Sequence, residues 1–572
     1  MKRILGFLKP YVKESICAPL FKMLEAIFEL FVPLVVASII DNGISNSDNG
    51  YIFKMVLLMF LLAAIGLICS VTAQYFAAKA AVGTATSIRS SLFRHIQSLG
   101  YTELDKMGTE TLITRMTSDI NQVQNGINMV LRLFLRSPFI VFGAMIMAFT
   151  IDVKAALIFV GAIILLSIVV FGVMLITRPM YKNSQSTLDK ILGITRENLT
   201  GARVIRAFNC EDSEVTNFRS SNEKLTAIQK MAGKISGLSN PLTFVIINFA
   251  VIILVHTGAI RVNIGALSQG QVVALYNYMS QILVELVKLA NLIVSITKAM
   301  ACANRINDLF NVESSDVSGV LSEGILSAPA VEFKNVSFGY ANGGDEAISN
   351  INFKIGKGQT VGVIGSTGSG KSTLLNLIPR FYTATNGEVL IDGKNIKEYT
   401  DDTIRKKIAV VPQKAQLFKG TIKDNITIGN RSASDEDIEK ALDVSQSREF
   451  VDKKENRLDF MIEQGGKNLS GGQKQRLTIA RALVMNSDIL ILDDSASALD
   501  YATDAKLRRA IRNLENHPTV FIASQRASSV MYADMIIVMD DGVVAGAGTH
   551  EQLLESCETY KEIYDSQFKK EA

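Results

Sequence analysis

The chain has 572 residues, a formal net charge of +4, 48% hydrophobic residues and only 20% charged residues. A single compact core does not reach this length, because such cores stop growing near about 250–300 residues. The small net charge gives no reason to expect a nucleic-acid partner. The five cysteines are scattered without a paired spacing, so neither a disulfide framework nor a zinc site is expected.

The first 300 residues have the pattern of a membrane protein. Residues 1–15 are basic and amphipathic, and we expect them to form a helix on the inner membrane face. A helix needs about 20 apolar residues to cross a bilayer, and we expect residues 16–300 to form a six-helix α-helical transmembrane domain. The predicted spans are residues 16–40, 52–78, 127–150, 154–177, 236–260 and 269–298.

The distribution of Lys and Arg predicts how these spans are oriented. The short connections 41–51, 151–153 and 261–268 contain one Lys or Arg between them, whereas 79–126 contains five and 178–235 contains ten. Positively charged loops stay on the cytoplasmic side. We therefore expect both termini and the C-terminal half to be cytoplasmic in a multi-pass protein of the cell (plasma) membrane.

The two long cytoplasmic segments carry helical patterning without a continuous apolar run. We expect spans 2 to 5 to continue as helices beyond the membrane. Polar and acidic patches at Tyr101–Thr109 and Asn209–Asn217 are the predicted bends between these helices, and we expect the bends to contact the soluble domain.

Charged residues interrupt three of the predicted spans. Charge at membrane depth is costly and usually faces a bundle interior or a cavity. Two interpretations stay open, namely structural pairing or snorkelling near the interface, and the lining of a substrate path. The residues concerned are Lys22, Glu25, Glu29, Arg132, Arg136, Glu285 and Lys288.

The C-terminal half has the pattern of a nucleotide-binding domain. Residues 301–330 are expected to be a linker, and strand-like and helical stretches alternate over 331–572, which predicts an α/β domain with a largely parallel sheet. A G-x-x-x-x-G-K-[ST] phosphate loop follows the apolar run Thr360–Ile364. In such a loop the backbone N–H groups curl around phosphate oxygens, the lysine reaches the β- and γ-phosphates, and the hydroxyl after it binds Mg²⁺. We therefore expect ATP and Mg²⁺ to be bound, with the nucleotide held by Gly365, Ser366, Thr367, Gly368, Ser369, Gly370, Lys371, Ser372 and Thr373.

Two further motifs lie downstream of the phosphate loop. The run Ile489–Asp493 predicts a buried strand that ends in a carboxylate able to hold Mg²⁺ through water. In the other motif a serine and two glycines open a helix, which gives a second anion-binding helix terminus. Two phosphate-binding segments with one nucleotide between them are consistent with two chains that meet head to tail. The residues of this second segment are Leu469, Ser470, Gly471, Gly472 and Gln473.

This ordered set of motifs resembles the ATP-binding cassette (ABC) transporters, and the six fused spans resemble the exporter branch of that family. The resemblance covers nearly the whole chain and implies an α/β P-loop NTPase fused to the spans, acting as an ATPase coupled to transport. It implies that Tyr340 stacks on adenine, that Gln413 senses Mg²⁺ and the γ-phosphate, and that Asp500 contacts the opposing subunit. Glu463–Gly466 lies where the family has a loop that touches the inner bends. The implied metal-binding residues are Ser372, Gln413 and Asp493.

At two positions the chain departs from the family pattern. The family places a glutamate directly after Asp493 to polarise the attacking water, but this chain has Asp494. Where the family places a histidine against the γ-phosphate, this chain has Gln525, which cannot become cationic. Because misplacing a catalytic group by about 1 Å can cost ~100-fold in rate, we interpret Asp494 and Gln525 as a degenerate catalytic pair.

Since the binding motifs are intact, asymmetry between two chains is the economical interpretation. This chain's own loop would bind ATP and hydrolyse it poorly, while its segment Leu469–Gln473 would complete a competent site on a second homologous half-transporter that carries the glutamate and the histidine. The pattern resembles the degenerate-site subunit of bacterial heterodimeric multidrug exporters. A slow homodimeric exporter and an ATP-binding regulatory or channel subunit without pumping remain as alternatives. Membrane lipid and a small-molecule, lipid or peptide substrate are the other expected partners, and no motif selects among these substrates.

Overall fold

The structure falls into two compact units. The computed structural model describes residues 2–314, 319–325, 327–340, 343, 345–495 and 497–568. The first unit comprises Met1–His95 and Glu110–Asn311, and the second comprises Ile96–Thr109 and Val312–Ala572. The second unit therefore joins the C-terminal domain to a short segment that lies between the second and third predicted spans.

The first unit is built from long helices. Within the described residues, six helical stretches are long and apolar enough to cross a membrane, as the sequence predicts. These stretches are Lys9–Ile44, Asn49–Gln97, Thr109–Ile151, Val153–Thr200, Glu211–Asn263 and Gln269–Phe310. The individual helices are α1 (Lys2–Gly6), η1 (Lys9–Tyr11), α2 (Val12–Ser38), η2 (Ile39–Ile44), α3 (Asn49–Gln97), α5 (Thr109–Thr114), η3 (Arg115–Asp119), α6 (Ile120–Leu133), α7 (Arg136–Ile151), α8 (Val153–Thr200), α9 (Ala202–Ala207), α10 (Glu211–Gly237), α11 (Ser239–Asn263) and α12 (Gln269–Phe310).

Small residues lie at the helix contacts, and large apolar residues face outward. Ala18 of α2 and Ala77 and Ala80 of α3 are fully buried in one cluster that also includes Leu131 of α6. Phe53 and Phe60 on α3 are 70% and 74% exposed. This inversion of a soluble protein's pattern is what a lipid environment favours, because small side chains let helices approach and lipid solvates the apolar exterior.

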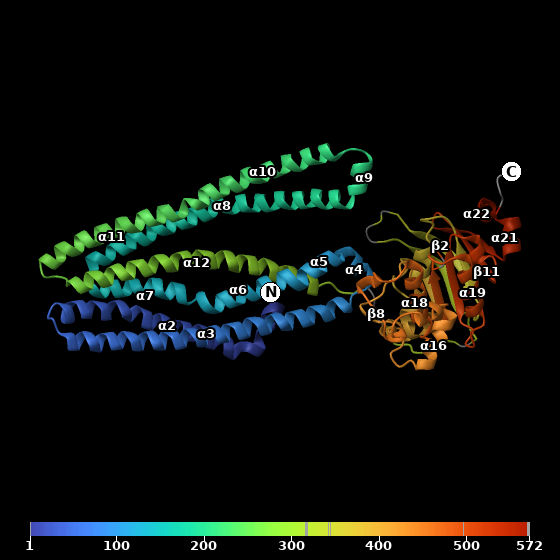
Figure 1. Ribbon diagram of the computed structural model, residues 1–572, viewed down its shortest axis with the longest axis horizontal. Helices are drawn as coiled ribbons and strands as arrows, with labels where there is room; N and C mark the ends of the chain where they lie inside the picture. Colours follow the sequence, from blue (N-terminus) through green and yellow to red (C-terminus); the bar gives the residue numbers. More distant parts are fainter. Residues whose placement is uncertain are drawn as a thin grey trace. The chain divides into compact units, whose positions relative to one another are not determined.

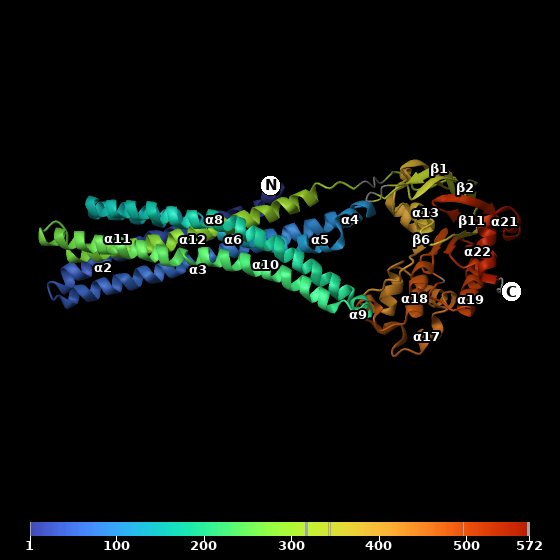
Figure 2. The ribbon, with the colours of Figure 1, turned by 90° about the horizontal axis from the view of Figure 1, so that it is seen from above.

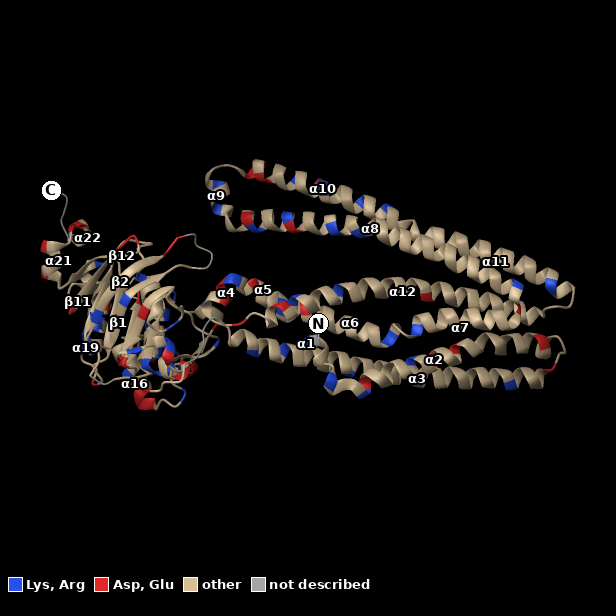
Figure 3. Cartoon of the chain, turned by 180° about the vertical axis from the view of Figure 1, so that it is seen from behind, with Lys and Arg blue, Asp and Glu red and all other residues tan. Residues whose placement is uncertain are grey.

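The helix α8 runs beside both α10 and α11, as Figures 1 and 2 show. Figure 3 shows frequent charges where α8 lies along α10 and few where it lies along α11. The apolar half of this hairpin therefore has the character of membrane spans, and the charged half continues the same helices into a polar environment, which confirms the predicted extensions.

The third span is broken near its middle. α6 ends at Leu133, α7 begins at Arg136, and Pro138 lies in the first turn of α7. Proline lacks a backbone N–H and its ring disfavours helical continuation through the preceding turn, so the break has a local cause. It places Arg136, which is 7% exposed, at a helix start inside the bundle.

Two boundaries differ from the sequence-based expectation. The first long helix begins at Val12, inside the segment expected to lie on the membrane surface. The helix α12 continues to Phe310, so residues 301–310 are helical and are not a linker, because buried apolar residues recur at helical spacing to its end. Residues 315–318 and 326 of the expected linker lie outside the described residues.

The second unit contains a parallel sheet and an antiparallel sheet. The six-stranded sheet has the order β12-β11-β3-β10-β9-β6, and only its edge strand β12 is antiparallel. The four-stranded antiparallel sheet β2-β1-β4-β5 was not expected from the sequence. The strands are β1 (Val331–Phe338), β2 (Ile348–Ile355), β3 (Thr360–Ile364), β4 (Asn386–Ile391), β5 (Lys394–Asn395), β6 (Ile408–Val411), β7 (Gly420–Thr421), β8 (Met461–Ile462), β9 (Ile489–Asp493), β10 (Thr519–Ser524), β11 (Met535–Asp540) and β12 (Val543–Gly548). The main helices are α4 (Tyr101–Met107), α13 (Lys371–Leu377), α14 (Asp401–Lys407), α15 (Ile422–Thr427), α16 (Asp435–Val444), α17 (Arg448–Asp452), α18 (Gly471–Leu483), α19 (Tyr501–Arg512), α20 (Ala527–Val530), α21 (His550–Ser556) and α22 (Glu558–Phe568).

The register of the parallel strands brings three motifs to one edge. Ser524 of β10 pairs with Ile364 of β3, and Ala523 of β10 pairs with Asp493 of β9. Because these three strands are parallel, the segments that follow them emerge together. The phosphate loop, Asp494 and Gln525 are therefore neighbours, at the edge where α/β sheets bind ligands.

Candidate nucleotide-binding site

The phosphate loop connects β3 to α13 and depends on glycine at its ends. Gly370, immediately before α13, has φ of 93°, a left-handed conformation that favours glycine. A Cβ on Gly365 would lie 2.1 Å from the Met539 carbonyl oxygen, so no larger residue fits there. The tight turn leaves the helix N-terminus with unpaired N–H groups that suit a phosphate.

Lys371 lies at this loop with its ammonium group among backbone oxygens. Its Nζ donates hydrogen bonds to the carbonyl oxygens of Gly365 at 2.9 Å and Ser366 at 2.6 Å. Burial lowers the pKa of Lys371, while the nearby carboxylates of Asp494 and Asp493 oppose that shift. A nucleotide phosphate would favour the charged lysine in the same way.

Ser372 and Asp493 form the candidate metal site. The Ser372 hydroxyl donates to the Asp493 Oδ1 at 2.9 Å, and Asp493 is 8% exposed. Burial raises the pKa of the Asp493 carboxyl, with the charge of Asp494 acting in the same direction and the Ser372 hydrogen bond and Lys371 acting against it. A hydroxyl and an undercompensated buried carboxylate are hard oxygen donors, so the pair fits Mg²⁺.

Asp494 directly follows Asp493 in the chain and contacts Gln413. It adopts φ of 46°, and its backbone N–H donates to the Ala523 carbonyl oxygen at 3.1 Å. The Gln413 Nε2 donates to the Asp494 Oδ2 at 3.3 Å. The structure thus brings together the residues that the sequence predicted as a metal sensor and as a shortened catalytic acid.

Gln525 follows β10 and faces the phosphate loop. The Thr367 hydroxyl donates to the Gln525 Oε1 at 3.4 Å, and Gln567 Nε2 donates to the Gln525 backbone oxygen at 2.8 Å. The side chain is exposed. A neutral amide therefore lies beside the loop.

Tyr340 lies against α13. Its hydroxyl is 3.1 Å from the Thr373 Oγ1, and its ring is edge-on to Phe338 and Tyr382 at 5.0 and 5.2 Å. The ring is 36% exposed, so one side remains open to a planar ligand.

The segment Leu469–Gln473 belongs to a separate helical part of the unit. Leu469 is buried in the core of α15–α18, and Ser470 and Gln473 form a reciprocal cap at the start of α18. Ser470 and Gly471 are exposed, so this helix N-terminus is open to a ligand from outside. Asp500 is also exposed; it caps α19 through the Thr503 N–H at 2.9 Å, and this hydrogen bond lowers the pKa of Asp500.

Sequence reasoning predicted that Tyr101–Thr109 contacts the soluble domain, and the structure confirms it. Tyr101 stacks on Phe381 with ring centroids 4.6 Å apart, and the Tyr382 hydroxyl donates to the Asp105 Oδ2 at 2.6 Å. The receiving residues Phe381 and Tyr382 were missed. An aromatic pair placed just after the phosphate-loop helix was the available signal.

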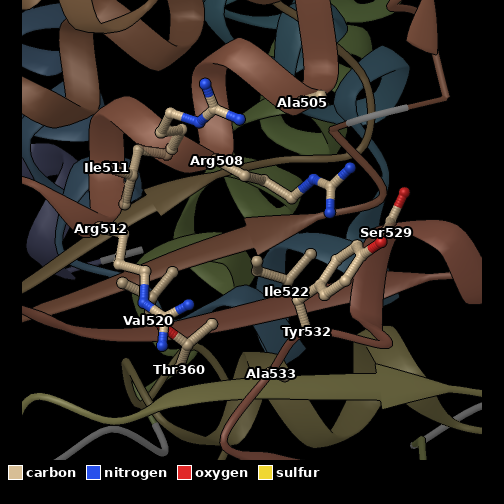
Figure 4. A pocket seen from close by; sticks show the side chains of 11 residues that line it. Thr360, Ala505, Arg508, Ile511, Arg512, Val520, Ile522, Ser529, Tyr532 and Ala533 are labelled. Atoms are coloured by element: carbon tan, nitrogen blue, oxygen red, sulfur yellow. The ribbon is translucent and has the colours of Figure 1, made fainter. Parts of the chain in front are cut away.

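Another cavity, of about 510 Å³, lies near the opposite end of the parallel strands. Figure 4 shows Arg508 and Arg512 of α19 above a floor that includes Val520 and Ile522, with Tyr532 at one side. Thr360, the first residue of β3, also lines it. The cavity contains none of the nucleotide motifs, which follow the carboxyl ends of these strands.

A bundle of apolar helices joined to a P-loop domain defines an ATP-powered membrane transporter, and comparison with known proteins supports this class. Residues 15–286 match the family described as the ABC transporter transmembrane region, and residues 348–497 match the family described as ABC transporter. The chain is 34% identical to YfiB of Bacillus subtilis (strain 168), an uncharacterized ABC transporter ATP-binding protein, with 100% of this chain and 99% of that protein covered. It is 30% identical to the ATP-dependent lipid A-core flippase of Escherichia coli (strain K12), with 99% and 97% covered.

The fold is also that of a solved structure, a bacterial Atm1-family ABC exporter with ATP bound. The TM-score is 0.80 at 22% identity, and 99% of each chain is covered. The chain belongs to the ABC transporter family. It is a multi-pass membrane protein and an ATP-driven exporter whose ATP-binding domain is an ATPase coupled to transport, which confirms the predicted class.

Proposed function

We propose that this chain is one half of a heterodimeric exporter and that its own ATP site is the poorly hydrolysing one. The observation that carries the proposal is the pair Asp494 and Gln525 at the edge of the phosphate loop. Asp494 is one methylene shorter than glutamate, and its carboxylate accepts a hydrogen bond from Gln413. Gln525 offers an amide where a cationic imidazole would stabilise the γ-phosphate, and an amide cannot take up or release a proton at physiological pH.

The same site retains what nucleotide binding requires. Lys371 offers an ammonium group and Gly365–Gly370 offers backbone N–H groups to the phosphates. Ser372 and Asp493 would hold Mg²⁺, with Gln413 on the neighbouring Asp494, and the ion would neutralise phosphate charge. The proposed outcome is a site that grips ATP and cleaves it slowly.

The exposed terminus at Ser470 and Gly471 supports a second role in the dimer. Its N–H groups would complete the site of a second homologous half-transporter that carries the glutamate and the histidine, with Asp500 at the contact between the subunits. ATP then joins the two cassettes, because each nucleotide touches both. Hydrolysis at the competent site separates them again, which is alternating access by population shift.

The movement that closes the cassettes must be transmitted to the spans. In this proposal α4 transmits it, because Tyr101 and Asp105 pack on Phe381 and Tyr382, which follow α13. In this proposal both termini and the ATP-binding domain are cytoplasmic, in the cell membrane. The Escherichia coli relative is a lipid flippase, and the cargo of this exporter is a small molecule, a lipid or a peptide.

Co-purification tests the proposal. The chain is tagged and isolated in mild detergent, and its ATPase rate is measured alone and together with any homologous half-transporter that accompanies it. We expect a companion chain and a rate at least about 100-fold higher for the pair than for this chain alone. Brisk turnover by the isolated chain would indicate an active homodimer and refute the asymmetric pair. ATP-independent substrate flux in vesicles would instead favour a regulatory or channel subunit.

A further inference from the structure

Six charged side chains meet inside the first unit, on α2, α7 and α12. Arg136 is their centre: its Nη1 lies 2.6 Å from the Glu285 Oε1, and its Nη2 lies 2.7 Å from the Glu29 Oε2. Lys22 pairs with Glu25 at 2.5 Å, and Lys288 pairs with Glu285 at 2.8 Å. Figure 3 shows charged positions on the ribbons of all three helices. Three cations and three carboxylates give this cluster a formal net charge of zero.

Stability alone does not account for such a cluster. Taking ions out of water costs several kcal/mol each, and apolar replacements of buried ion pairs are often neutral or stabilising. Charges at membrane depth therefore point to a ligand or ion path. The structure shows the pairing that one of the two interpretations from the sequence expected, and two of the paired side chains keep a substantial exposed fraction.

The exposed members are of opposite sign. The side chains of Glu29 and Lys288 are 39% and 43% exposed, whereas those of Arg136 and Glu285 are 8% and 4% exposed. Glu285 already accepts three hydrogen bonds, from Arg136, from Lys288 and from the Ser137 hydroxyl at 2.7 Å. The charges left to meet a ligand are therefore the carboxylate of Glu29 and the ammonium group of Lys288.

Both of these side chains line one cavity of about 410 Å³. Its size lies within the range of small-ligand pockets. Val32 and Val284 supply apolar walls. Gln281 also lines this cavity, and its Oε1 is buried and has no hydrogen-bond partner among the described residues. An unpaired buried acceptor is costly, and a ligand ammonium group would satisfy it.

We propose that this cavity binds a zwitterionic group, with the ligand's ammonium on Glu29 and Gln281 and its phosphate or carboxylate on Lys288. A purely cationic ligand would be repelled by the Lys288 ammonium, and a purely anionic ligand would be repelled by the Glu29 carboxylate. Both repulsions are strong in a medium of low dielectric constant. A zwitterion pairs with both and leaves the net charge at zero. The inference deepens the proposed function by naming the chemistry of the cargo.

Equilibrium binding without ATP tests it, so the result is independent of how well the ATP site hydrolyses. The full chain in nanodiscs is titrated with lysophosphatidylethanolamine, which is zwitterionic, with lysophosphatidylglycerol, which is anionic, and with dodecylamine, which is cationic. We expect the zwitterion to bind at least about 10-fold more tightly than the other two. O-phosphoethanolamine, which has no acyl chain, separates a lipid headgroup from a free zwitterion as the source of the chemistry.

Three variants assign the contacts. Glu29→Gln keeps an oxygen for Arg136, and the cavity should then no longer bind the zwitterion more tightly than the anion. With Lys288→Gln, the cavity should no longer bind the zwitterion more tightly than the cation. Gln281→Leu should weaken both ammonium-bearing probes and leave the anion unchanged. Lys298→Gln, an exposed position on the same helix α12, is the matched control and should change none of the ratios.

The outcomes that overturn the proposal are equal binding of all three charged probes, no binding of any, or variants that weaken every probe by the same factor. The last result would mean that the cluster is only structural. Because the ratio between probes is measured, a general loss of folded protein cannot imitate the expected result. Failure of the asymmetric ATPase model would leave these ratios untouched, so the two proposals fail separately.

Discussion

The Tyr382 hydroxyl donates a 2.6 Å hydrogen bond to the Asp105 carboxylate, 277 positions earlier in the chain. Burial raises the pKa of Tyr382, and the Asp105 carboxylate raises it further, so the phenol stays protonated and remains a donor. The bond ties the helix between two spans to the residues that follow the phosphate loop.

Breaking this bond should uncouple transport from ATP binding. For Tyr382→Phe we expect unchanged ATP affinity and a clear loss of substrate-stimulated ATPase, because the ring contacts remain but the link to α4 is weakened. A hydrogen bond to a charged group contributes about 1.5–3 kcal/mol when it is well formed. The double variant with Asp105→Asn should lose little more than either single variant in an ATPase assay, and fully additive losses would show that the two residues act independently.

The two phosphate-binding segments should serve different sites. In the assembled pair, Ser470→Ala should reduce total ATPase far more than Lys371→Ala does, because Ser470 completes the partner's competent site and Lys371 serves the slow one. The measurement is steady-state phosphate release by each purified complex. Equal and mild losses from both variants would contradict the asymmetric assignment.

Restoring one catalytic side chain should not restore the site. Asp494→Glu alone should raise the chain's own ATPase little, since Gln525 still cannot act as an imidazole. The double variant Asp494→Glu with Gln525→His should raise it by about 100-fold or more, if correct placement is worth what misplacement costs. ATP affinity is the control and should change in neither variant. Full activity from Asp494→Glu alone would show that Gln525 is not limiting.

The ionised carboxylate of Asp493 should lower the stability of the fold when no nucleotide is bound. Its pKa is raised by burial, and a group whose folded pKa lies above the unfolded value contributes stability at low pH that is lost as pH rises through the folded pKa. Asp493→Asn, which keeps an acceptor for Ser372, should therefore raise the unfolding temperature at pH 7 without nucleotide. The same variant should lose about 10–100-fold in Mg²⁺-dependent ATP binding.

For wild type, lowering the pH toward that raised pKa should weaken the binding of Mg²⁺ with ATP, because the ion must then displace a proton. Calorimetric titration at two pH values checks this. An Asp493→Asn protein that is less stable than wild type without nucleotide would show that the buried charge is already compensated.

A single native cysteine can report the orientation of the membrane unit. Cys210, which lies between α9 and α10, is exposed, whereas Cys69, Cys302 and Cys557 are buried and Cys17 is partly buried. A membrane-impermeant maleimide should label Cys210 rapidly in inside-out vesicles and poorly in intact cells. Cys210→Ser is the control. Labelling from the outside of intact cells would invert the proposed topology.

The sequence by itself determined the membrane spans and the phosphate loop. Apolar runs of about 20 residues can satisfy their backbone only as helices in lipid, and the phosphate loop carries its function within nine adjacent residues. These are local constraints, so the pattern of residues is sufficient to find them. The break before Pro138 is local too, and Pro138 itself was the available signal, which the span prediction did not use.

The tertiary structure alone decided which distant side chains meet. Nothing in the spacing of Glu29, Arg136 and Glu285 shows that three helices bring them into contact, and the unsatisfied oxygen of Gln281 is defined only by its surroundings. The contact of Asp105 with Tyr382 is of the same kind. Such pairings depend on how helices and sheets pack and on which register they adopt, and those are set by the whole core and not by any one segment.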